Sequence, residues 1–352
     1  MSTDDNTPSA GDSTPVQDFY RDCGVLVTGG TGFLGKLVIE KILRCCPAAR
    51  TVYVLIRPKK GVSAEDRRKA LMDNEVFERM KNEQPDWQSR LVFVSGDCSQ
   101  PRLGLSDTDY HHLTQHVNIV LHLAATVRFD ETLKVAIAIN VKGTQEVIRL
   151  CRDCVHLKVS VCVSTAYSNC IHRVVKEEIY SPPMALDQLF ALMDRFTERE
   201  IVMMLPKILG AWPNTYSFSK AMSEYLLFTQ AKDLPISVIR PSMVLAAIAE
   251  PIPGWLENVY GPIGIAFGGG TGVLHVCYAD AEKVLDTVPA DMVSNCIIAA
   301  AFAAGNREKG GIDVYNITMA KTNLETVKHL PPGVSRNNQC PVIHFQAIRV
   351  LH

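Results

Sequence analysis

A tyrosine and a lysine four residues apart are the pair in this sequence best suited to acid–base chemistry. Tyr216 and Lys220 lie within Tyr-Ser-Phe-Ser-Lys, and this spacing places both side chains on one face of a helix. A free phenol, with a pKa of about 10, is a weak acid at neutral pH. A cation within about 4–6 Å can lower that pKa by about 1–3 units. We therefore predict that Lys220 lowers the pKa of Tyr216 and that Tyr216 transfers protons.

Two hydroxyl side chains could hold a substrate oxygen beside that phenol. Ser164 and Thr165 directly follow residues 158–163, an apolar run typical of a buried strand. A hydroxyl and a phenol together would stabilise charge on a carbonyl oxygen as hydride reaches the carbonyl carbon. The sequence does not separate the two hydroxyls, and we prefer Thr165. A Tyr-x-x-x-Lys spacing occurs by chance in many helices, so its meaning depends on the elements around it.

A glycine cluster stands between an apolar run at 24–28 and a helical pattern at 36–43. Its spacing fits Gly-x-Gly-x-x-Gly and Gly-x-x-Gly-x-x-Gly at once. Glycines there let the chain turn sharply and approach a pyrophosphate, and the helix N-terminus supplies N–H groups to that anion. A tight turn is the alternative, but a strand before and a helix after favour a dinucleotide. The residues predicted to hold it are Gly29, Gly30, Thr31, Gly32, Phe33, Leu34 and Gly35.

A cluster of basic residues after the second predicted strand bears on the choice between NADPH and NADH. The NAD version of this motif has a carboxylate at the end of the second strand, where this sequence has Arg57, followed by Lys59 and Lys60. A guanidinium suits a 2′-phosphate, so we predict NADPH rather than NADH. A solvated basic turn is the alternative. Asp97, after the third predicted strand, could bond the adenine amino group or serve a turn.

Further cofactor contacts are expected where other strands end, because ligands of such sheets gather beyond the carboxyl ends of the strands. These candidates are Ala124, Ala125, Asn140, Pro241 and Ser242. Asn140 lies inside a helical pattern over 132–152 and could bond a backbone carbonyl or a water near the lysine. His122, inside the fourth strand, reads as a core histidine with satisfied hydrogen bonds rather than a base.

The elements that position these residues alternate in type. Apolar runs predict strands at 24–28, 51–56, 91–95, 117–123, 158–163, 236–240 and 313–318, and helical patterns separate them. This order predicts an α/β fold with a Rossmann-like doubly wound parallel sheet and a smaller, loop-rich substrate-binding part. We expect a disordered lead over 1–20, a reductase domain over 21–318 and an atypical tail over 319–352. The substrate part is assigned mainly to 170–213, with one long helix near 184–205, and to 243–290.

Composition limits the classes of function. The chain has 352 residues, a formal net charge of −1 and eleven cysteines. The small net charge gives no field that would attract nucleic acid. No window reaches the length of a membrane span, and no cysteine spacing indicates a metal site; Cys151 and Cys154 read as packing residues. Free thiols suit a reducing compartment, so the sequence alone indicates a soluble cytosolic protein.

The motifs together resemble the extended short-chain dehydrogenase/reductases, and among them the fatty acyl-CoA reductases. The similarity includes the glycine cluster, Leu-Ile-Arg-Pro ending at residue 58, and residues 122–131, 163–169, 213–221 and 239–244. It continues through Glu-Pro-Ile-Pro-Gly-Trp at 250–255 and Val-Pro-Ala-Asp-Met-Val at 288–293. The last two motifs resemble acyl-CoA reductases rather than sugar epimerases.

The resemblance implies NADPH-dependent reduction of a long-chain acyl-CoA to a primary alcohol through an aldehyde. It implies that Tyr216 donates the proton, that Lys220 tunes the phenol, and that Thr165 or Ser164 holds the oxyanion. It also implies association with peroxisomal or endoplasmic reticulum membranes. The similarity stops near residue 318, where family members continue with a further helical domain. Two alternatives stay open: an NADPH-binding protein without turnover, and an extended reductase acting on another carbonyl or a nucleotide sugar.

Overall fold

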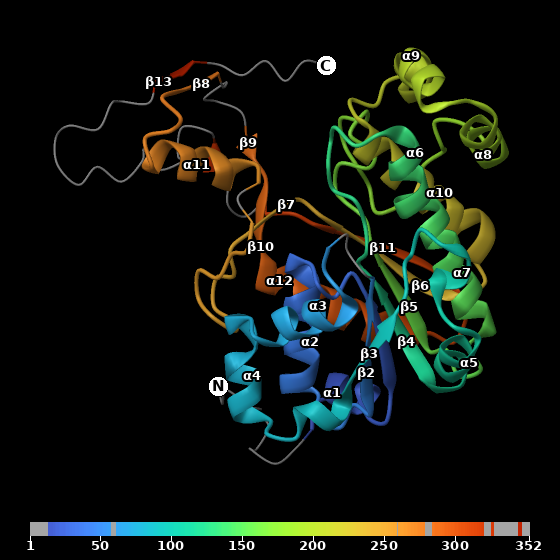
Figure 1. The fold of residues 1–352 in the computed structure, drawn as a ribbon, viewed down its shortest axis with the longest axis vertical. Coiled ribbons are helices and arrows are strands. Elements are labelled where there is room, and N and C mark those ends of the chain that lie inside the picture. Colours follow the sequence, from blue (N-terminus) through green and yellow to red (C-terminus); the bar gives the residue numbers. More distant parts are fainter. Residues whose placement is uncertain are drawn as a thin grey trace, which may run out of the picture.

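The computed structural model describes residues 13–57, 61–258, 260–278, 284–319, 325–326 and 344–346. Its centre is one parallel sheet of seven strands in the order β11-β6-β5-β4-β1-β2-β3 (Figure 1). The strands are β1 (Gly24–Thr28), β2 (Thr51–Ile56), β3 (Leu91–Ser95), β4 (Val117–His122), β5 (Val159–Val163), β6 (Pro235–Pro241) and β11 (Gly311–Ile317). This order confirms the predicted doubly wound sheet, and each predicted strand lies within about two residues of the observed one.

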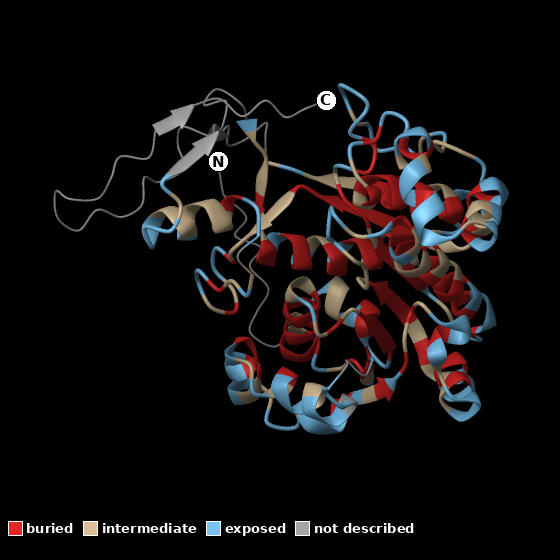
Figure 2. Cartoon of the chain, turned by 45° about the horizontal axis from the view of Figure 1, so that its top comes forward, coloured by how far each residue is buried: buried red, intermediate tan, exposed pale blue. Residues whose placement is uncertain are grey.

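Helices cover both faces of the sheet because its strands are apolar on both sides. On one face α2 (Phe33–Cys45) and α12 (Ala290–Gly305) pack on each other and bury one continuous core with β1, β2 and β5. On the other face lie α5 (Asp107–His116), α7 (Gly143–Asp153) and α10 (Thr215–Ala231). Figure 2 shows the strands and the inner helices buried, with exposed residues gathered on the outer turns.

The helix between β4 and β5 is continuous but irregular. It begins as α6 (Leu133–Ala136), passes through a π-helical segment at Ile137–Lys142 and continues as α7. A π segment inside a helix commonly marks a functional position. This one contains Asn140, one of the predicted cofactor residues.

Two predictions on helices are wrong. The predicted disordered lead over 1–20 ends in a helix, α1 (Pro15–Tyr20), whose Thr14–Gln17 capping box fixes its start and whose Phe19 and Tyr20 are buried in the core. The predicted single helix near 184–205 is two helices, α8 (Leu186–Arg195) and α9 (Glu198–Leu209). A second capping box, between Thr197 and Glu200, starts α9 and breaks the continuous pattern.

The remaining elements are short. Charged sequence after β2 forms α3 (Ala64–Met72), a 3-10 turn (Glu75–Phe77) and α4 (Glu78–Glu83), and two further 3-10 turns flank β3 (Trp87–Arg90 and Pro101–Gly104). After β6 come β7 (Met243–Leu245), α11 (Pro262–Gly270), β8 (Val276–Tyr278), β9 (Val284–Leu285) and β10 (Thr287–Pro289). β7 pairs with β10, β9 with β12 (Glu325–Thr326) and β8 with β13 (His344–Gln346). The rest of the predicted tail lies outside the described residues.

The two segments assigned to substrate lie on opposite sides of the molecule. In Figure 1, α8 and α9 lie on one side and α11 on the other. The apolar faces of α8 and α9 join the core beneath α10, through residues such as Leu189, Ile201 and Ile208. Among the described residues, no helix is long and apolar enough to cross a membrane.

Candidate active site

The glycine cluster forms the turn between β1 and α2, and its glycines are needed for shape. Gly29 has φ +72°, and a Cβ there would lie 2.6 Å from the backbone nitrogen of Ala124, at the end of β4. A Cβ on Gly35 would overlap the carbonyl of Gly29. Both positions therefore exclude a side chain. At Gly29 the backbone conformation and the close approach of Ala124 both exclude it, and at Gly35 the close approach of the Gly29 carbonyl excludes it.

The same turn fits a dinucleotide. Gly32 is the N-cap of α2 and offers no side-chain cap, so the first-turn N–H groups at Phe33, Leu34 and Gly35 have no partner within the helix. A Cβ on Gly32 would meet only the Gly29 carbonyl oxygen, at 3.3 Å, so this side of the loop is open. Free N–H groups at an open helix N-terminus are what a diphosphate requires.

A first prediction concerns the close approach at Gly29. Gly29→Ala should weaken binding of a nicotinamide cofactor at least tenfold and lower the free energy of unfolding by about 1–2 kcal/mol, because a left-handed residue gains a Cβ that strikes the backbone just after β4. Fluorescence titration and urea unfolding measure the two effects. Gly210→Ala is the matched control: Gly210 has φ +57° but nothing within 4 Å of its Cβ position. Equal effects on binding in both variants would contradict the prediction.

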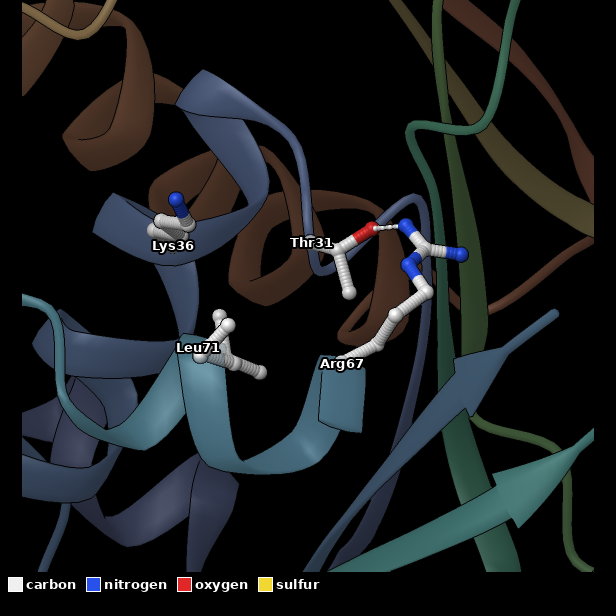
Figure 3. Close-up of a pocket in the computed structure, with 5 residues that line it drawn as sticks. Thr31, Lys36, Arg67 and Leu71 are labelled. Atoms are coloured by element: carbon white, nitrogen blue, oxygen red, sulfur yellow. Dashed lines mark hydrogen bonds between the residues drawn. The ribbon is translucent and has the colours of Figure 1, made fainter. Parts of the chain in front are cut away.

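Two arginines stand beside the glycine loop at the end of β2. Arg57 is half exposed, and its Nη1 lies 3.8 Å from Asp97 Oδ2. Arg67, on α3, donates from Nη2 to Thr31 Oγ1 at 2.5 Å and from Nη1 to the Arg57 carbonyl at 2.5 Å. Figure 3 shows Arg67 reaching Thr31 at the rim of a pocket of about 130 Å³, which Lys36, Ala70 and Leu71 also line.

The basic cluster therefore differs in part from the one expected from sequence. Lys59 and Lys60 lie outside the described residues, whereas Arg67 was not predicted at all. Its position, ten residues after Arg57 in a charged helix, gave no signal until the fold placed α3 against the glycine loop. Asp97 forms a turn, accepting from Ser99 N–H at 2.9 Å and Ser99 Oγ at 2.8 Å. Its second oxygen faces Arg57.

Tyr216 and Lys220 both contact the chain at the end of β5, Tyr216 at Thr165 and Lys220 at Val163. α10 begins at the Asn214 cap, and Tyr216 stands in its first turn. Lys220 is buried and its Nζ donates to the Val163 carbonyl at 2.8 Å. A hydrogen bond links Thr165 to the phenol of Tyr216.

The direction of the Tyr216 pKa differs from the prediction. Burial raises the pKa of Tyr216 to about 12, and the hydrogen bond with Thr165 offsets part of the rise. Burial has the opposite effect on a cationic group and lowers the pKa of Lys220 to about 8, although the charges of Cys162 and Glu224 act to raise it. The expected lowering of the phenol pKa by Lys220 is absent because desolvation dominates and the ammonium is directed at Val163. A phenol with a raised pKa keeps its proton at neutral pH, as a proton donor must.

The fold decides which of the two candidate hydroxyls, Ser164 or Thr165, lies beside the phenol. Ser164 is buried and donates to Glu224 Oε1, a carboxylate one turn beyond Lys220 on α10. Thr165 bonds Tyr216 instead. Thr165 is therefore the hydroxyl beside the phenol, and Ser164 faces away from it toward a buried ion pair.

The remaining predicted residues lie around the same edge. Asn140 accepts from Thr126 N–H at 2.9 Å and donates to the Thr126 carbonyl and to Ser219 Oγ, so it holds the chain after β4 against α10. Ala124 donates its N–H to Thr28 Oγ1 at 3.2 Å, and Ala125 follows it. Asn140 therefore bonds a backbone carbonyl, one of the two roles considered for it.

Two further predicted residues lie at the end of β6, and His122 lies in the core. The Pro241 carbonyl accepts from Ala166 N–H at 2.9 Å, and the Ser242 hydroxyl is buried with no partner in the described part of the chain. An orphaned buried hydroxyl there fits a polar ligand group. His122 bonds Thr28 at 2.7 Å and Thr144 at 3.2 Å, and burial lowers its pKa to about 3. The interpretation of His122 as a satisfied core histidine is confirmed.

A strap formed by residues 247–258 ties two late motifs to the cofactor helix. The Asp291 carboxylate accepts the N–H groups of three consecutive strap residues, 248–250. Glu250 pairs with Lys41 and Arg44 of α2, each at 2.6 Å. Trp255 stacks on Phe33 with ring centroids 5.3 Å apart. The motifs at 250–255 and 288–293 thus bind each other and the helix that follows the glycine loop.

The candidate site lies within the part of the chain that matches a known protein family. The family model described as "Male sterility protein" matches residues 27–297, which include the glycine loop, Thr165, Tyr216 and Lys220. The chain belongs to this family. Its relatives include the fatty acyl-CoA reductase wat of Drosophila melanogaster, 42% identical over 315 residues that cover 90% of this chain and 61% of the relative. Fatty acyl-CoA reductase 1 of Homo sapiens is 37% identical over 308 residues, covering 88% and 60%.

These comparisons confirm the resemblance to fatty acyl-CoA reductases within the extended short-chain dehydrogenase/reductases. The chain spans about three fifths of the length of these relatives. A solved reductase domain of a non-ribosomal peptide synthetase from Mycobacterium tuberculosis shares the fold, with a TM-score of 0.60 and 23% identity over 84% of this chain and 67% of that one.

Two further predictions concern metals and thiols. Among the described residues, no group of three His, Cys, Asp or Glu side chains could hold a metal ion. The nine cysteines whose side chains the structure describes are free, and six of them are buried. Cys151 and Cys154 pack in the core beneath α5 and α7, so their interpretation as packing residues is confirmed.

Proposed function

We propose that this chain reduces a long-chain acyl-CoA thioester to a primary alcohol at the expense of NADPH. The observation that carries the proposal is that Tyr216 contacts Thr165 and Lys220 contacts Val163 at the same strand end, in a chain whose relatives are fatty acyl-CoA reductases. A nicotinamide cofactor fits the open N-terminus of α2 and the edge of the sheet. When bound, it supplies the hydride.

The residues at this edge have distinct roles in two reductions. In the first, hydride adds to the thioester carbonyl carbon, Thr165 holds the oxygen and Tyr216 donates its proton to it, giving a thiohemiacetal. Loss of the coenzyme A thiol leaves an aldehyde. In the second, Tyr216, reprotonated from water, would again protonate the oxygen as a second hydride from the cofactor reaches the aldehyde carbon, giving the alcohol. Lys220 would bond the nicotinamide ribose.

NADPH is favoured over NADH by the two arginines at the end of β2. Arg57 presents a half-exposed guanidinium after β2, and Arg67 donates to the Arg57 carbonyl and to Thr31 of the glycine loop. Charge-assisted hydrogen bonds from guanidinium groups suit a 2′-phosphate. The carboxylate that binds a ribose 2′-hydroxyl in NAD-specific sites is replaced at this position by Arg57.

The proposal is tested with the purified chain, NADPH and palmitoyl-CoA, following loss of NADPH absorbance and identifying products by gas chromatography. The expected result is formation of hexadecanol with two molecules of NADPH consumed for each one. Tight NADPH binding without turnover would instead support a non-catalytic cofactor-binding protein. Turnover only with a uridine diphosphate sugar would support another extended reductase.

Lys220 gives the reaction an expected pH dependence. Its pKa falls from 10.5 to about 8, so Lys220 is an ammonium below that pH and loses its charge above it. The Tyr216 pKa of about 12 keeps the phenol protonated throughout. Turnover should therefore fall as pH rises through about 8. Activity measured between about pH 6 and pH 10 checks this. Lys220→Arg should show no such fall in whatever activity it retains, because a guanidinium stays charged over this range.

The family resemblance also leads us to propose a location at peroxisomal or endoplasmic reticulum membranes. Fluorescence microscopy of the tagged chain beside organelle markers tests it. A uniform cytosolic signal would count against both organelles.

A further inference from the structure

A buried ion pair that takes no part in proton transfer lies against the loop that carries Thr165. Glu224, on α10, and Arg240, near the end of β6, have side chains 3% and 0% exposed. Arg240 Nη2 lies 2.6 Å from Glu224 Oε2 and its Nε lies 3.0 Å from Oε1. Burying two charges is costly, and such a pair stabilises a fold no better than well-packed apolar side chains do. Stability alone therefore gives no reason for the pair.

The carboxylate of Glu224 is shared with the loop that carries Thr165. Oε1 accepts from Ser164 Oγ, and Oε2 accepts from Asn169 Nδ2 at 3.2 Å. Both bonds hold the ends of the 164–169 loop, one immediately before Thr165 and one four residues after it. Because Glu224 is also one helical turn beyond Lys220, the loop is fixed relative to the helix that carries Tyr216.

The guanidinium of Arg240 reaches in the other direction, to a segment that precedes α8. Its Nη1 donates to the Lys176 carbonyl at 2.9 Å and its Nη2 to the Glu178 carbonyl at 2.8 Å. The Arg240 guanidinium also lies over the ring of Tyr180, 5.9 Å from its centroid. One ion pair thus supports the Thr165 loop and the first part of the segment assigned to substrate.

We propose that Glu224 and Arg240 are positioning residues, which hold Thr165 against Tyr216 and tie residues 176–180 to the same support. This inference rests on the proposed reductase function. It assigns to the pair an effect on turnover rather than on cofactor affinity, because within the described part of the chain the pair has no hydrogen bond or ion pair with the glycine loop, Arg57 or Arg67. A displacement of a reacting group by about 1 Å can reduce a rate about 100-fold.

The test replaces the pair with apolar side chains of similar length. Glu224→Met/Arg240→Met should fold and bind NADPH within about twofold of the original chain. Its turnover with palmitoyl-CoA should fall about 10- to 100-fold, and backbone hydrogen exchange over 164–180 should accelerate about tenfold. The control is Arg307→Met/Asp313→Met, which removes a pair at 2.9 Å near the opposite end of β6 and β11. Turnover and exchange over 164–180 should stay within about twofold in the control.

The outcomes separate this inference from the proposed function. Unchanged exchange and turnover in Glu224→Met/Arg240→Met, or equal changes in the control, would overturn the positioning role. If the original chain has no turnover, the proposed function fails, and hydrogen exchange still decides whether the pair orders the loop. If the double variant does not fold, Ser164→Ala/Asn169→Ala removes both of the loop's bonds to Glu224, together with the bond from Asn169 to Ser168, and leaves the ion pair intact; the same measurements then decide.

Discussion

Replacing Tyr216 with phenylalanine is expected to lower turnover with palmitoyl-CoA by about 10²- to 10⁴-fold, the usual contribution of a positioned general acid. The substitution removes only the hydroxyl, which bonds Thr165, and leaves the ring beside Phe129, with centroids 5.7 Å apart. Since the phenol does not support the glycine loop, NADPH affinity should change little. Steady-state kinetics and fluorescence titration measure the two quantities.

The matched control is Tyr225→Phe, two turns further along α10, where the side chain packs against the core near α8 and α9. It loses the same atom but should keep its turnover within about twofold. Equal losses in both variants would mean that α10 is being disturbed, and full activity in Tyr216→Phe would remove the phenol from the mechanism.

Replacing Arg57 with aspartate is expected to lower the preference for NADPH over NADH by about 10- to 150-fold. A charge-assisted hydrogen bond contributes about 1.5–3 kcal/mol, which corresponds to that range of affinity. Aspartate also repels a 2′-phosphate and could accept from a ribose hydroxyl. Arg67→Ala should have a smaller effect, because Arg67 already donates to Thr31 and to the Arg57 carbonyl. Dissociation constants for both cofactors provide the measurement.

Arg152→Asp is the control for net charge. Arg152 is an exposed arginine on α7 that pairs with Asp233 at 2.8 Å, away from the glycine loop. It changes the net charge by the same amount and should leave the cofactor preference unaltered at physiological salt. An unchanged preference in Arg57→Asp would refute the assignment of the 2′-phosphate to this corner.

The strap shows how motifs acquire meaning only when the fold brings them together. The segments 250–255 and 288–293 were recognised from sequence, and loops of that kind were expected to contact substrate. In the structure Asp291 binds the backbone of the strap and Trp255 stacks on Phe33, so these motifs also hold the cofactor helix. The partners of the strap on α2 lie more than 200 residues away in the chain, and Asp291 lies 41–43 residues from the amides it binds, so neither segment carries a periodic signal of these contacts.

The sequence by itself determined the parts that depend on local pattern. Apolar runs and the helices between them predicted the parallel sheet, glycine spacing predicted the turn before α2, and the four-residue spacing placed Tyr216 and Lys220 on one helical face. Each follows from the period of a strand or a helix, or from the conformational freedom of glycine, within a short window.

Only the tertiary structure decided the contacts among those elements. It placed Arg67 against Thr31 and Ser164 against Glu224. It also placed Thr165 against Tyr216, which lies 51 positions further along the chain. It also reversed the expected direction of the Tyr216 pKa, because the cost of burying a phenolate depends on everything packed around it. Which side chains meet, and how much water they keep, is set by long-range packing that no local spacing encodes.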